Sequence, residues 1–183
     1  PHGKPYVLFV GSVKPHKNLL RLLQAFASVQ KHIPPDLVII GRREGLITGD
    51  ASAMAMASGM SDRVICVGEL EHGDELLRRF YRYADVLVMP SLYESFGLPA
   101  LEALASGCPV IVSRVAGLPE VYGEGAMYCD PYDPSDIAER IRLMVSDRGV
   151  RQQYLAAGQV VAAQYDWDTT AEQVAAVVCA SRQ

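Results

Sequence analysis

The chain has 183 residues, half of them hydrophobic and 21% charged, which is typical of a soluble globular α/β protein with a single core. Its formal net charge is −4, so the composition gives no support to a nucleic-acid-binding surface or a basic membrane-surface patch. No apolar stretch approaches the roughly 18 residues of a membrane-spanning helix. We therefore expect a single α/β domain that covers residues 1–183.

Short β-branched, apolar runs alternate with longer amphipathic stretches along the chain. The apolar runs predict strands at Tyr6–Val10, Leu37–Ile40, Val64–Val67, Val86–Met89, Val110–Val112 and Ala126–Tyr128. The amphipathic stretches predict helices at Leu19–Gln30, Ala51–Ser58, Glu75–Tyr83, Pro99–Ser106, Ser135–Val145, Val150–Gln164 and Asp168–Cys179. Such alternation predicts right-handed βαβ crossovers and a mostly parallel sheet that is covered by helices on both faces. Ligands bind such sheets at the carboxyl ends of the strands, where the strand order reverses.

The loop after the first strand, Gly11–Asn18, leads directly into a helix for which Asn18 is the expected N-cap. Lys14 and Lys17 stand beside this helix N-terminus, where the helix dipole disfavours a cation unless an anion is also bound. We interpret Lys17 as an anion-binding residue and Lys14 as a solvated loop charge. The loop contains neither the glycine pattern of dinucleotide-binding domains nor a P-loop, which argues against a dehydrogenase.

Three further strand ends contain glycine. The second strand is followed by Gly41, Arg42 and Arg43, whose guanidinium groups could contact a phosphate or form a solvated rim. Gly68 after the third strand could let a flat base approach the backbone, although an ordinary turn glycine explains it equally well. The fifth strand is followed by a Gly-Pro turn at Gly117–Pro119, on the same predicted edge of the sheet.

The most informative segment, residues 90–107, follows the fourth strand. Pro99 opens a helix there that a glycine closes, and Gly97 lies in the turn before it. Free N–H groups and the positive end of the helix dipole at such a turn bind phosphate or pyrophosphate. Glu94 precedes the turn and Glu102 lies about one turn inside the helix, so both carboxylates could face one crevice.

An anion cradle with two flanking carboxylates suits a molecule that has a diphosphate and sugar hydroxyls at both ends. A nucleotide-sugar is such a molecule. The alternative is that each Glu only complements the helix dipole, as carboxylates near helix starts often do. Their joint occurrence around a glycine-containing turn after a buried strand favours the binding role.

The four cysteines are far apart in the sequence and form no C-x-x-C pair. Three of them, Cys66, Cys108 and Cys129, lie in or beside apolar strand runs, so we expect buried thiols in a reducing cytosol rather than disulfides or a zinc site. The four histidines show no metal-ligand spacing either. We therefore expect a cytoplasmic protein without a metal site.

Taken in order, these motifs resemble the retaining GT-B glycosyltransferases of glycosyltransferase family 4, which includes sucrose synthase-like enzymes and bacterial mannosyl- and glucosyltransferases. The resemblance covers nearly the whole chain and is found at Phe9–Gly11, Lys17–Asn18, Val67–Gly68, Ala84–Val86, Pro90–Ala103, Gly107–Ile111, Gly117–Glu120 and Tyr165–Trp167. It implies the donor-binding, C-terminal half of a two-domain enzyme. The implied fold is a Rossmann-like three-layer α/β/α domain with a mostly parallel six-stranded sheet.

The resemblance also implies roles for individual residues. Lys17 would contact the donor diphosphate, and the backbone amides of Gly97–Leu98 would cradle it. Glu102 would bind the ribose hydroxyls, next to a base lined by the residues around Gly68. Glu94 would be the catalytic residue beside the transferred sugar. The implied substrate-binding residues are Gly11, Ser12, Lys17, Gly68, Glu69, Leu70, Ser95, Phe96, Gly97, Leu98 and Glu102.

One position departs from the family pattern, because Ser12 stands where the family usually has an arginine after the first-strand glycine. Lys14 or His16 could then supply the second basic contact to the diphosphate. The residues of the first loop, together with Gly41–Arg43, are similar to a mannosyltransferase subgroup. This similarity favours GDP-mannose as the donor.

A full enzyme of this family would also have an N-terminal acceptor domain of similar size, which we expect to be absent from this chain. The chain would then bind the nucleotide-sugar but transfer the sugar poorly or not at all by itself. No divalent metal is expected, because Lys17 and the helix terminus would neutralise the leaving group. The full-length enzyme could be peripheral to the inner face of a membrane. The alternative is a non-catalytic nucleotide-binding or scaffolding domain, since a fold does not fix a function.

Overall fold

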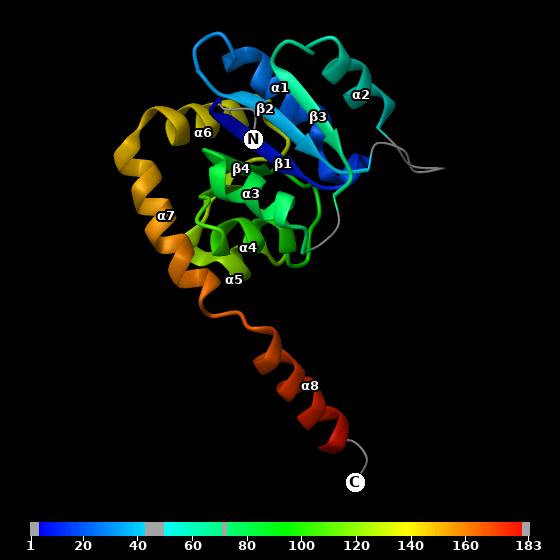
Figure 1. Cartoon of the computed structure of the whole chain (residues 1–183), viewed down its shortest axis with the longest axis vertical. Helices are drawn as coiled ribbons and strands as arrows, with labels where there is room; N and C mark the ends of the chain where they lie inside the picture. Colours follow the sequence, from blue (N-terminus) through cyan, green and yellow to red (C-terminus); the bar gives the residue numbers. More distant parts are fainter. Residues whose placement is uncertain (1–3, 43–49, 71–72, 181–183) are drawn as a thin grey trace.

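The computed structural model describes residues 4–42, 50–70 and 73–180 (Figure 1). The described strands are β1 (Tyr6–Val10), β2 (Asp36–Ile40), β3 (Val64–Gly68), β4 (Val86–Met89), β5 (Val110–Ser113) and β6 (Met127–Cys129). The described α-helices are α1 (Leu19–Val29), α2 (Ala51–Ser58), α3 (Glu75–Tyr83), α4 (Leu98–Ala105), α5 (Leu118–Tyr122), α6 (Pro134–Ser146), α7 (Arg148–Ala162) and α8 (Trp167–Ala180). Short 3₁₀ helices are η1 (Pro15–Lys17) and η2 (Gly123–Gly125).

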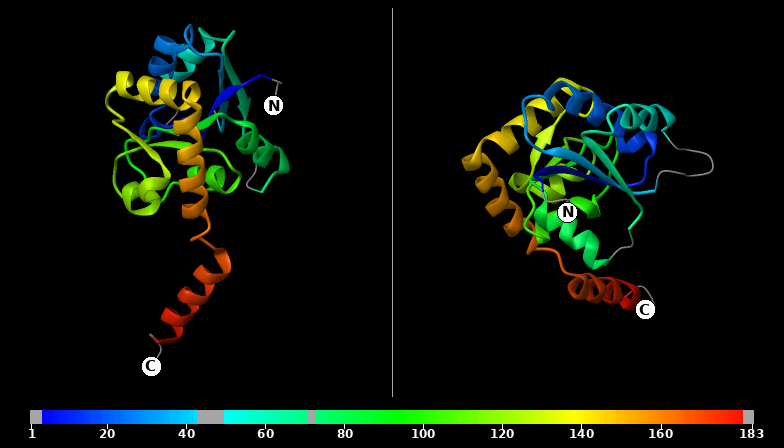
Figure 2. Two further views of the ribbon diagram at one scale, coloured as in Figure 1. Left: turned by 90° about the vertical axis from the view of Figure 1, so that its left-hand side faces the viewer. Right: turned by 45° about the horizontal axis from the view of Figure 1, so that its top comes forward.

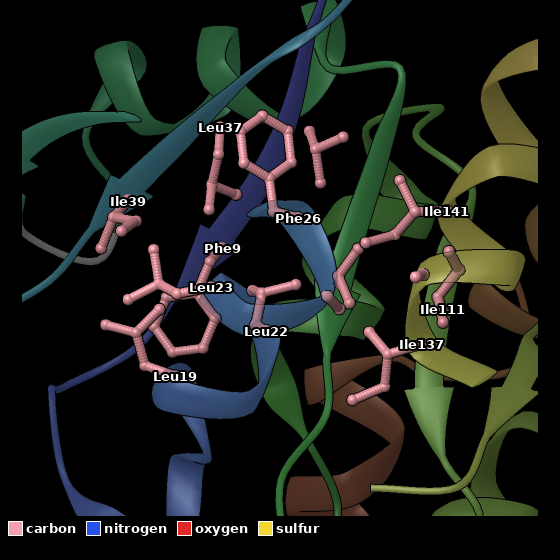
Figure 3. Packing of buried hydrophobic residues seen from close by; sticks show 14 of the residues in the cluster. Phe9, Leu19, Leu22, Leu23, Phe26, Leu37, Ile39, Ile111, Ile137 and Ile141 are labelled. Carbon is pink, nitrogen blue, oxygen red and sulfur yellow. The ribbon is translucent and has the colours of Figure 1, made fainter. Parts of the chain in front are cut away.

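Both faces of the sheet are covered by helices, because successive residues of each strand point to opposite faces. Val7 and Phe9 of β1 pack in one core with α1, α2 and α6. Tyr6 and Leu8 pack on the other face with α3, α4 and α5. Figure 3 shows the first of these cores, to which α1 contributes Phe26. The predicted three-layer α/β/α architecture is confirmed.

The strand order is β3-β2-β1-β4-β5-β6, and all neighbouring strands are parallel. From β1 the chain builds outward through β2 to β3 and then crosses back to place β4 on the other side of β1. The order therefore reverses between β1 and β4. The loops after these two strands border the place where open α/β sheets bind ligands.

The predicted strands and helices are all present, with ends that differ by at most two residues. The predicted Gly-Pro turn after β5 is present at Gly117 but does not extend to Pro119, which stands in the first turn of α5, where its ring favours a helix start. With five residues, α5 is too short to show a helical period in the sequence. Helix α4 begins at Leu98 rather than at Pro99, after Gly97 in the left-handed conformation.

The C-terminal helix α8 differs from the other described α-helices because none of its residues is buried. Figure 1 and the left view of Figure 2 show that α8 extends away from the body of the domain. Its exposed side chains include Trp167, Val174 and Val177. Within the described residues, none of the helices combines the length and the apolar character that crossing a lipid bilayer requires.

No disulfide joins the four cysteines, all of which lie in the described part of the chain. Cys108 and Cys129 are buried, as predicted, and burial raises the pKa of each of these thiols to about 12. Cys66 is only half-buried, so the prediction of burial is wrong there, because β3 is an edge strand with a neighbour on one side only. Cys179 is exposed on α8.

Candidate functional site

The loops after β1, β4 and β6 are tied together at the carboxyl edge of the sheet. The Leu92 N–H donates to the His16 carbonyl oxygen at 2.7 Å. The side-chain amide of buried Asn18 donates to the carbonyl oxygens of Pro90, at 2.9 Å, and of Pro131, at 2.7 Å. Asn18 is the N-cap residue of α1, as predicted, but its side chain makes no capping bond. Its amide holds the three loops together instead.

Lys17 and Glu94 meet at this edge, although 77 residues separate them in the sequence. Lys17 Nζ lies 2.5 Å from Glu94 Oε2, and only 20% and 17% of these side chains are exposed. Partial burial strengthens the attraction of the two charges relative to an open surface. A methyl group on Gly11 would lie 3.9 Å from Lys17 Cδ, so the lysine stem runs beside the end of β1. The structure therefore brings together the predicted anion-binding lysine and the predicted catalytic carboxylate.

The turn before α4 strongly favours glycine at position 97, chiefly through its backbone conformation. Gly97 has a φ of +79°, and a methyl group there would lie 2.6 Å from Met89 Cε. The Tyr122 hydroxyl donates to the Gly97 carbonyl oxygen at 2.7 Å, and burial raises the pKa of Tyr122 above its usual value, so it stays a donor. Leu98 is the first residue of α4. N–H groups in the first turn of a helix have no intrahelical acceptor and can therefore bind an anion.

The loop after β5 supports the loop after β4. A methyl group on Gly117 would lie 2.3 Å from the Ser95 carbonyl oxygen, so the two backbones approach closely. The next predicted site residue, Phe96, is half-buried and meets the ring of Tyr165 edge to face, with ring centroids 5.3 Å apart. The Ser95 side chain is exposed. These contacts fix the segment that contains Glu94 and leave its outer side open.

Glu102 on α4 accepts a hydrogen bond from the Tyr81 hydroxyl of α3 at 2.8 Å. Burial raises the pKa of Tyr81 well above its usual value, and the charge of Glu102 raises it further, so this hydroxyl also stays a donor. With Phe96 and Leu98, these residues line a cavity of about 1290 Å³ between α3, α4, the segment that joins α7 to α8 and the first turns of α8. Glu94 is not among the described residues that line it. The two predicted carboxylates therefore lie in different environments: Glu94 contacts Lys17, whereas Glu102 contacts Tyr81 beside the cavity.

The ends of β1, β2 and β3 are closely packed through glycines. The Gly41 N–H donates to the Gly68 carbonyl oxygen at 2.7 Å. A methyl group on Gly41 would lie 1.9 Å from the Gly11 carbonyl oxygen, so no larger residue fits. At Gly68 the φ is +100°, and a methyl group there would meet no atom of the described residues within 4 Å. Glycine is therefore needed at position 68 for its backbone conformation, and the space above it is open.

Other polar and apolar residues lie at or just after the ends of these three strands. Arg42 Nε lies 3.0 Å from Glu69 Oε2 in an exposed ion pair, whereas Arg43 lies outside the described residues. Leu70 is half-buried against the core on the α3 side. Ser12 is half-buried just after the end of β1. The predicted site residues thus lie in three places: the β3 end, the β1–β4 junction and the start of α4.

Tyr81, Tyr122 and the bridging amide of Asn18 support the site but were not among the predicted site residues. Each acts on a residue at least 21 positions away, so no local pattern identifies it. The one available signal was that a buried Tyr usually needs a hydrogen-bond partner. In the part of the chain that the structure describes, no three His, Cys, Asp or Glu side chains gather as a metal ion would require.

Comparison with known proteins identifies the family. The chain matches the family model "Glycosyl transferases group 1" over residues 1–177. It is 33% identical to O-antigen chain mannosyltransferase B of Escherichia coli over 171 residues, which cover 92% of this chain and 44% of that protein. It is 34% identical to an uncharacterized glycosyltransferase of Methanocaldococcus jannaschii over 170 residues, which cover 91% of this chain and 43% of that protein. The structure of sucrose-phosphate synthase from Thermosynechococcus elongatus superposes on this chain with a TM-score of 0.84 and 30% sequence identity. The superposition covers 97% of this chain and 45% of that protein.

The chain therefore belongs to the group 1 glycosyl transferase family, and its six-stranded parallel sheet with flanking helices is the Rossmann-like unit of a GT-B fold. It spans less than half the length of the three relatives just named. The predicted fold class and the predicted glycosyltransferase class are confirmed.

Proposed function

We propose that this chain is the donor-binding domain of a retaining hexosyltransferase and binds a nucleotide-sugar between the loops after β1 and β4. The contact between Lys17 and Glu94 is the observation on which this proposal rests. It sets a cation and a carboxylate side by side at the edge where open α/β sheets bind ligands. Membership in a glycosyl transferase family supports the same assignment, because sugar transfer requires a donor.

Donor binding would exchange the partner of Lys17. The diphosphate replaces Glu94 as the main partner of the ammonium, and N–H groups at the start of α4 add hydrogen bonds. Glu94 then faces the transferred sugar, where its carboxylate stabilises positive charge at the anomeric carbon. The bond from this carbon to the donor phosphate breaks, and its electron pair leaves with the phosphate oxygen. The acceptor hydroxyl oxygen forms the new bond on the same face, and its proton passes to the leaving phosphate.

The nucleoside would extend from the diphosphate toward α4 and the end of β3. Glu102 accepts hydrogen bonds from the ribose hydroxyls, and the Tyr81 hydroxyl holds its carboxylate in place. The base lies over Gly68, beside Glu69 and Leu70. The open space above Gly68 supports this placement.

We favour GDP-mannose as the donor, because the first loop resembles a mannosyltransferase subgroup and one relative is named a mannosyltransferase. No divalent metal takes part, since Lys17 and the first turn of α4 offset part of the charge of the departing diphosphate. The acceptor is bound by an N-terminal domain, without which the chain transfers sugar poorly. The enzyme acts in polysaccharide synthesis in the cytoplasm, at the inner face of the membrane.

A non-catalytic nucleotide-binding domain on the same fold is the second candidate. The contact between Lys17 and Glu94 also fits it, since the pair can hold the loops after β1 and β4 together without taking part in transfer. Both candidates bind a nucleotide-sugar. Only the first forms a glycoside when an acceptor domain is supplied.

Calorimetry with GDP-mannose, UDP-glucose and ADP-glucose in the presence of a chelator tests the proposal. We expect at least one donor to bind, and Lys17→Ala to weaken it about 10- to 100-fold, as loss of a charge-assisted hydrogen bond predicts. Lys31→Ala is the matched control, because Lys31 is exposed just beyond the other end of α1. A folded chain that binds none of the donors, or a Lys17→Ala variant that binds as tightly as the unmodified chain, contradicts the proposal.

A further inference from the structure

The diphosphate site proposed above is short of positive charge. The ammonium of Lys17 is already paired with the Glu94 carboxylate. The residue after Gly11 is Ser12, whose hydroxyl is neutral. The N-terminus of α4 contributes only about half an elementary charge. The diphosphate of a nucleotide-sugar carries a full negative charge on each phosphate, so a further cation would be needed to neutralise it.

His16 is held at this site by its backbone. It lies in η1, directly before Lys17, and its carbonyl oxygen accepts the Leu92 N–H at 2.7 Å. Leu92 is two residues from Glu94 in the loop after β4. The backbone of His16 is thus tied to both loops that border the proposed diphosphate site, and its side chain is exposed beside them.

The charged groups that act on the imidazole are Lys14 and Lys17 from its own loop and Glu94 from the loop after β4. Partial desolvation and the charge of Lys17 lower the pKa of His16 below its usual value, Lys14 adds to this, and Glu94 opposes it. Near neutral pH the imidazole of the ligand-free protein is therefore mostly uncharged. A bound anion would reverse the balance of charge around it.

We propose that His16 takes up a proton from solvent when the nucleotide-sugar binds, so that the imidazolium supplies the missing positive charge to the diphosphate. This inference depends on the proposed function, because it concerns the same site. It makes donor affinity depend on pH through the charge of the imidazole, since the diphosphate of a nucleotide-sugar does not titrate near neutrality. Mildly acidic conditions favour the donor complex, and higher pH favours release.

The direction of this pH dependence follows from the thermodynamic linkage between proton binding and donor binding. The pKa of His16 lies below its usual value in the free protein and rises in the complex, because the anion stabilises the protonated form. Between these two pKa values, binding takes up about one proton and affinity increases about tenfold for each unit by which the pH falls. Above the pKa of the complex the affinity reaches a constant lower value.

Calorimetry of GDP-mannose and UDP-glucose between about pH 6 and about pH 8, in two buffers with different heats of ionisation, measures proton uptake directly. A nucleotide-sugar is used because the terminal phosphate of a free nucleoside diphosphate itself titrates in this range. The variants are His16→Gln, which is always neutral, and His16→Arg, which is always charged. His32→Gln is the matched control, because His32 lies beyond the far end of α1.

We expect the unmodified chain and His32→Gln to take up about one proton on binding. His16→Gln should bind weakly with no proton uptake at any pH, and His16→Arg should bind tightly across the range, also without uptake. Affinity that does not change with pH in the unmodified chain overturns this inference alone, as does undiminished uptake in His16→Gln. Failure of both nucleotide-sugars to bind at any pH overturns the proposed function as well, so the two failures are distinguishable.

Discussion

Two ion pairs of similar geometry lie at opposite ends of the sheet. At the amino ends, Arg63 Nε lies 2.6 Å from Asp36 Oδ1, with 26% and 8% of the side chains exposed. At the carboxyl ends, Lys17 Nζ lies 2.5 Å from Glu94 Oε2, with 20% and 17% exposed. Distance and burial therefore do not distinguish the structural pair from the one at the proposed site.

The remaining hydrogen bonds do distinguish them. Arg63 also donates at 2.7 to 3.1 Å to three backbone carbonyl oxygens between α1 and β2, those of Gln30, Ile33 and Pro35. A guanidinium bound on several sides cannot change one partner without losing the others. Among the described residues, the Lys17 ammonium bonds only Glu94. A cation with a single partner can exchange it for a phosphate, and we take this as the mark of the functional pair.

Removing the guanidinium of Arg63 should produce the largest effect. Arg63→Met takes away the cation beside the buried Asp36 carboxylate and leaves backbone carbonyls unpaired, so we expect a loss of about 3 kcal/mol in the free energy of unfolding. Nucleotide-sugar affinity should not change, because the pair lies at the far end of the strands. Urea unfolding and calorimetry measure the two quantities.

The control for this prediction is Arg142→Met, which removes an exposed pair with Glu139 and should leave the free energy of unfolding nearly unchanged. A fall in nucleotide-sugar affinity in Arg63→Met, at unchanged stability, would reverse the assignment of the two pairs.

Glu102 differs from Asp36 and Glu94 because its carboxylate accepts a hydrogen bond from a neutral hydroxyl, that of Tyr81. Glu102→Gln keeps the size and helix propensity but removes the charge and one acceptor oxygen. We expect nucleotide binding to weaken by about 1.5–3 kcal/mol, equally with and without the sugar, because Glu102 binds the ribose. Glu139→Gln on α6 is the control. A lower melting temperature with unchanged affinity would give Glu102 a structural role only.

Glu94→Gln should have the smallest effect and the most specific one. It removes the negative charge that competes with the diphosphate for Lys17, so GDP should bind as well as before or slightly better. GDP-mannose should bind about fivefold less tightly, a difference of about 1 kcal/mol, because the contact to the sugar is weakened. With an acceptor domain present, kcat should fall more than KM rises. Equal losses of affinity for GDP and GDP-mannose would place Glu94 beside the nucleotide instead.

The fold could be predicted almost completely from local patterns. Buried strands leave short apolar runs in the sequence and packed helices leave a period near 3.6, so both were found within two residues. Helix α5 was not predicted, because five residues contain little more than one helical turn. In addition, Gly117 and Pro119 are residue types typical of loops. Its hydroxyl donor, Tyr122, was missed together with the helix.

Asn18 shows how tertiary contacts can override a local rule. Its residue type and position predict a capping bond to α1. The structure places it in the left-handed conformation with its amide directed to the carbonyl oxygens of Pro90 and Pro131. Both acceptors are buried at the loop junction, where an unpaired carbonyl would cost more than an unpaired N–H at a helix start that is open to water.

By itself, the sequence determined which chemical groups stand at the ends of the strands: a lysine, two glutamates and the glycines that let a backbone turn or approach closely. It did not determine which of them meet. Lys17 contacts Glu94 across 77 residues because the strand order places β4 beside β1. Glu102 contacts Tyr81 because α3 and α4 pack on the same face of the sheet. Hydrogen bonds depend on separations of a few ångströms between distant segments, and only the packed sheet and helices set those separations.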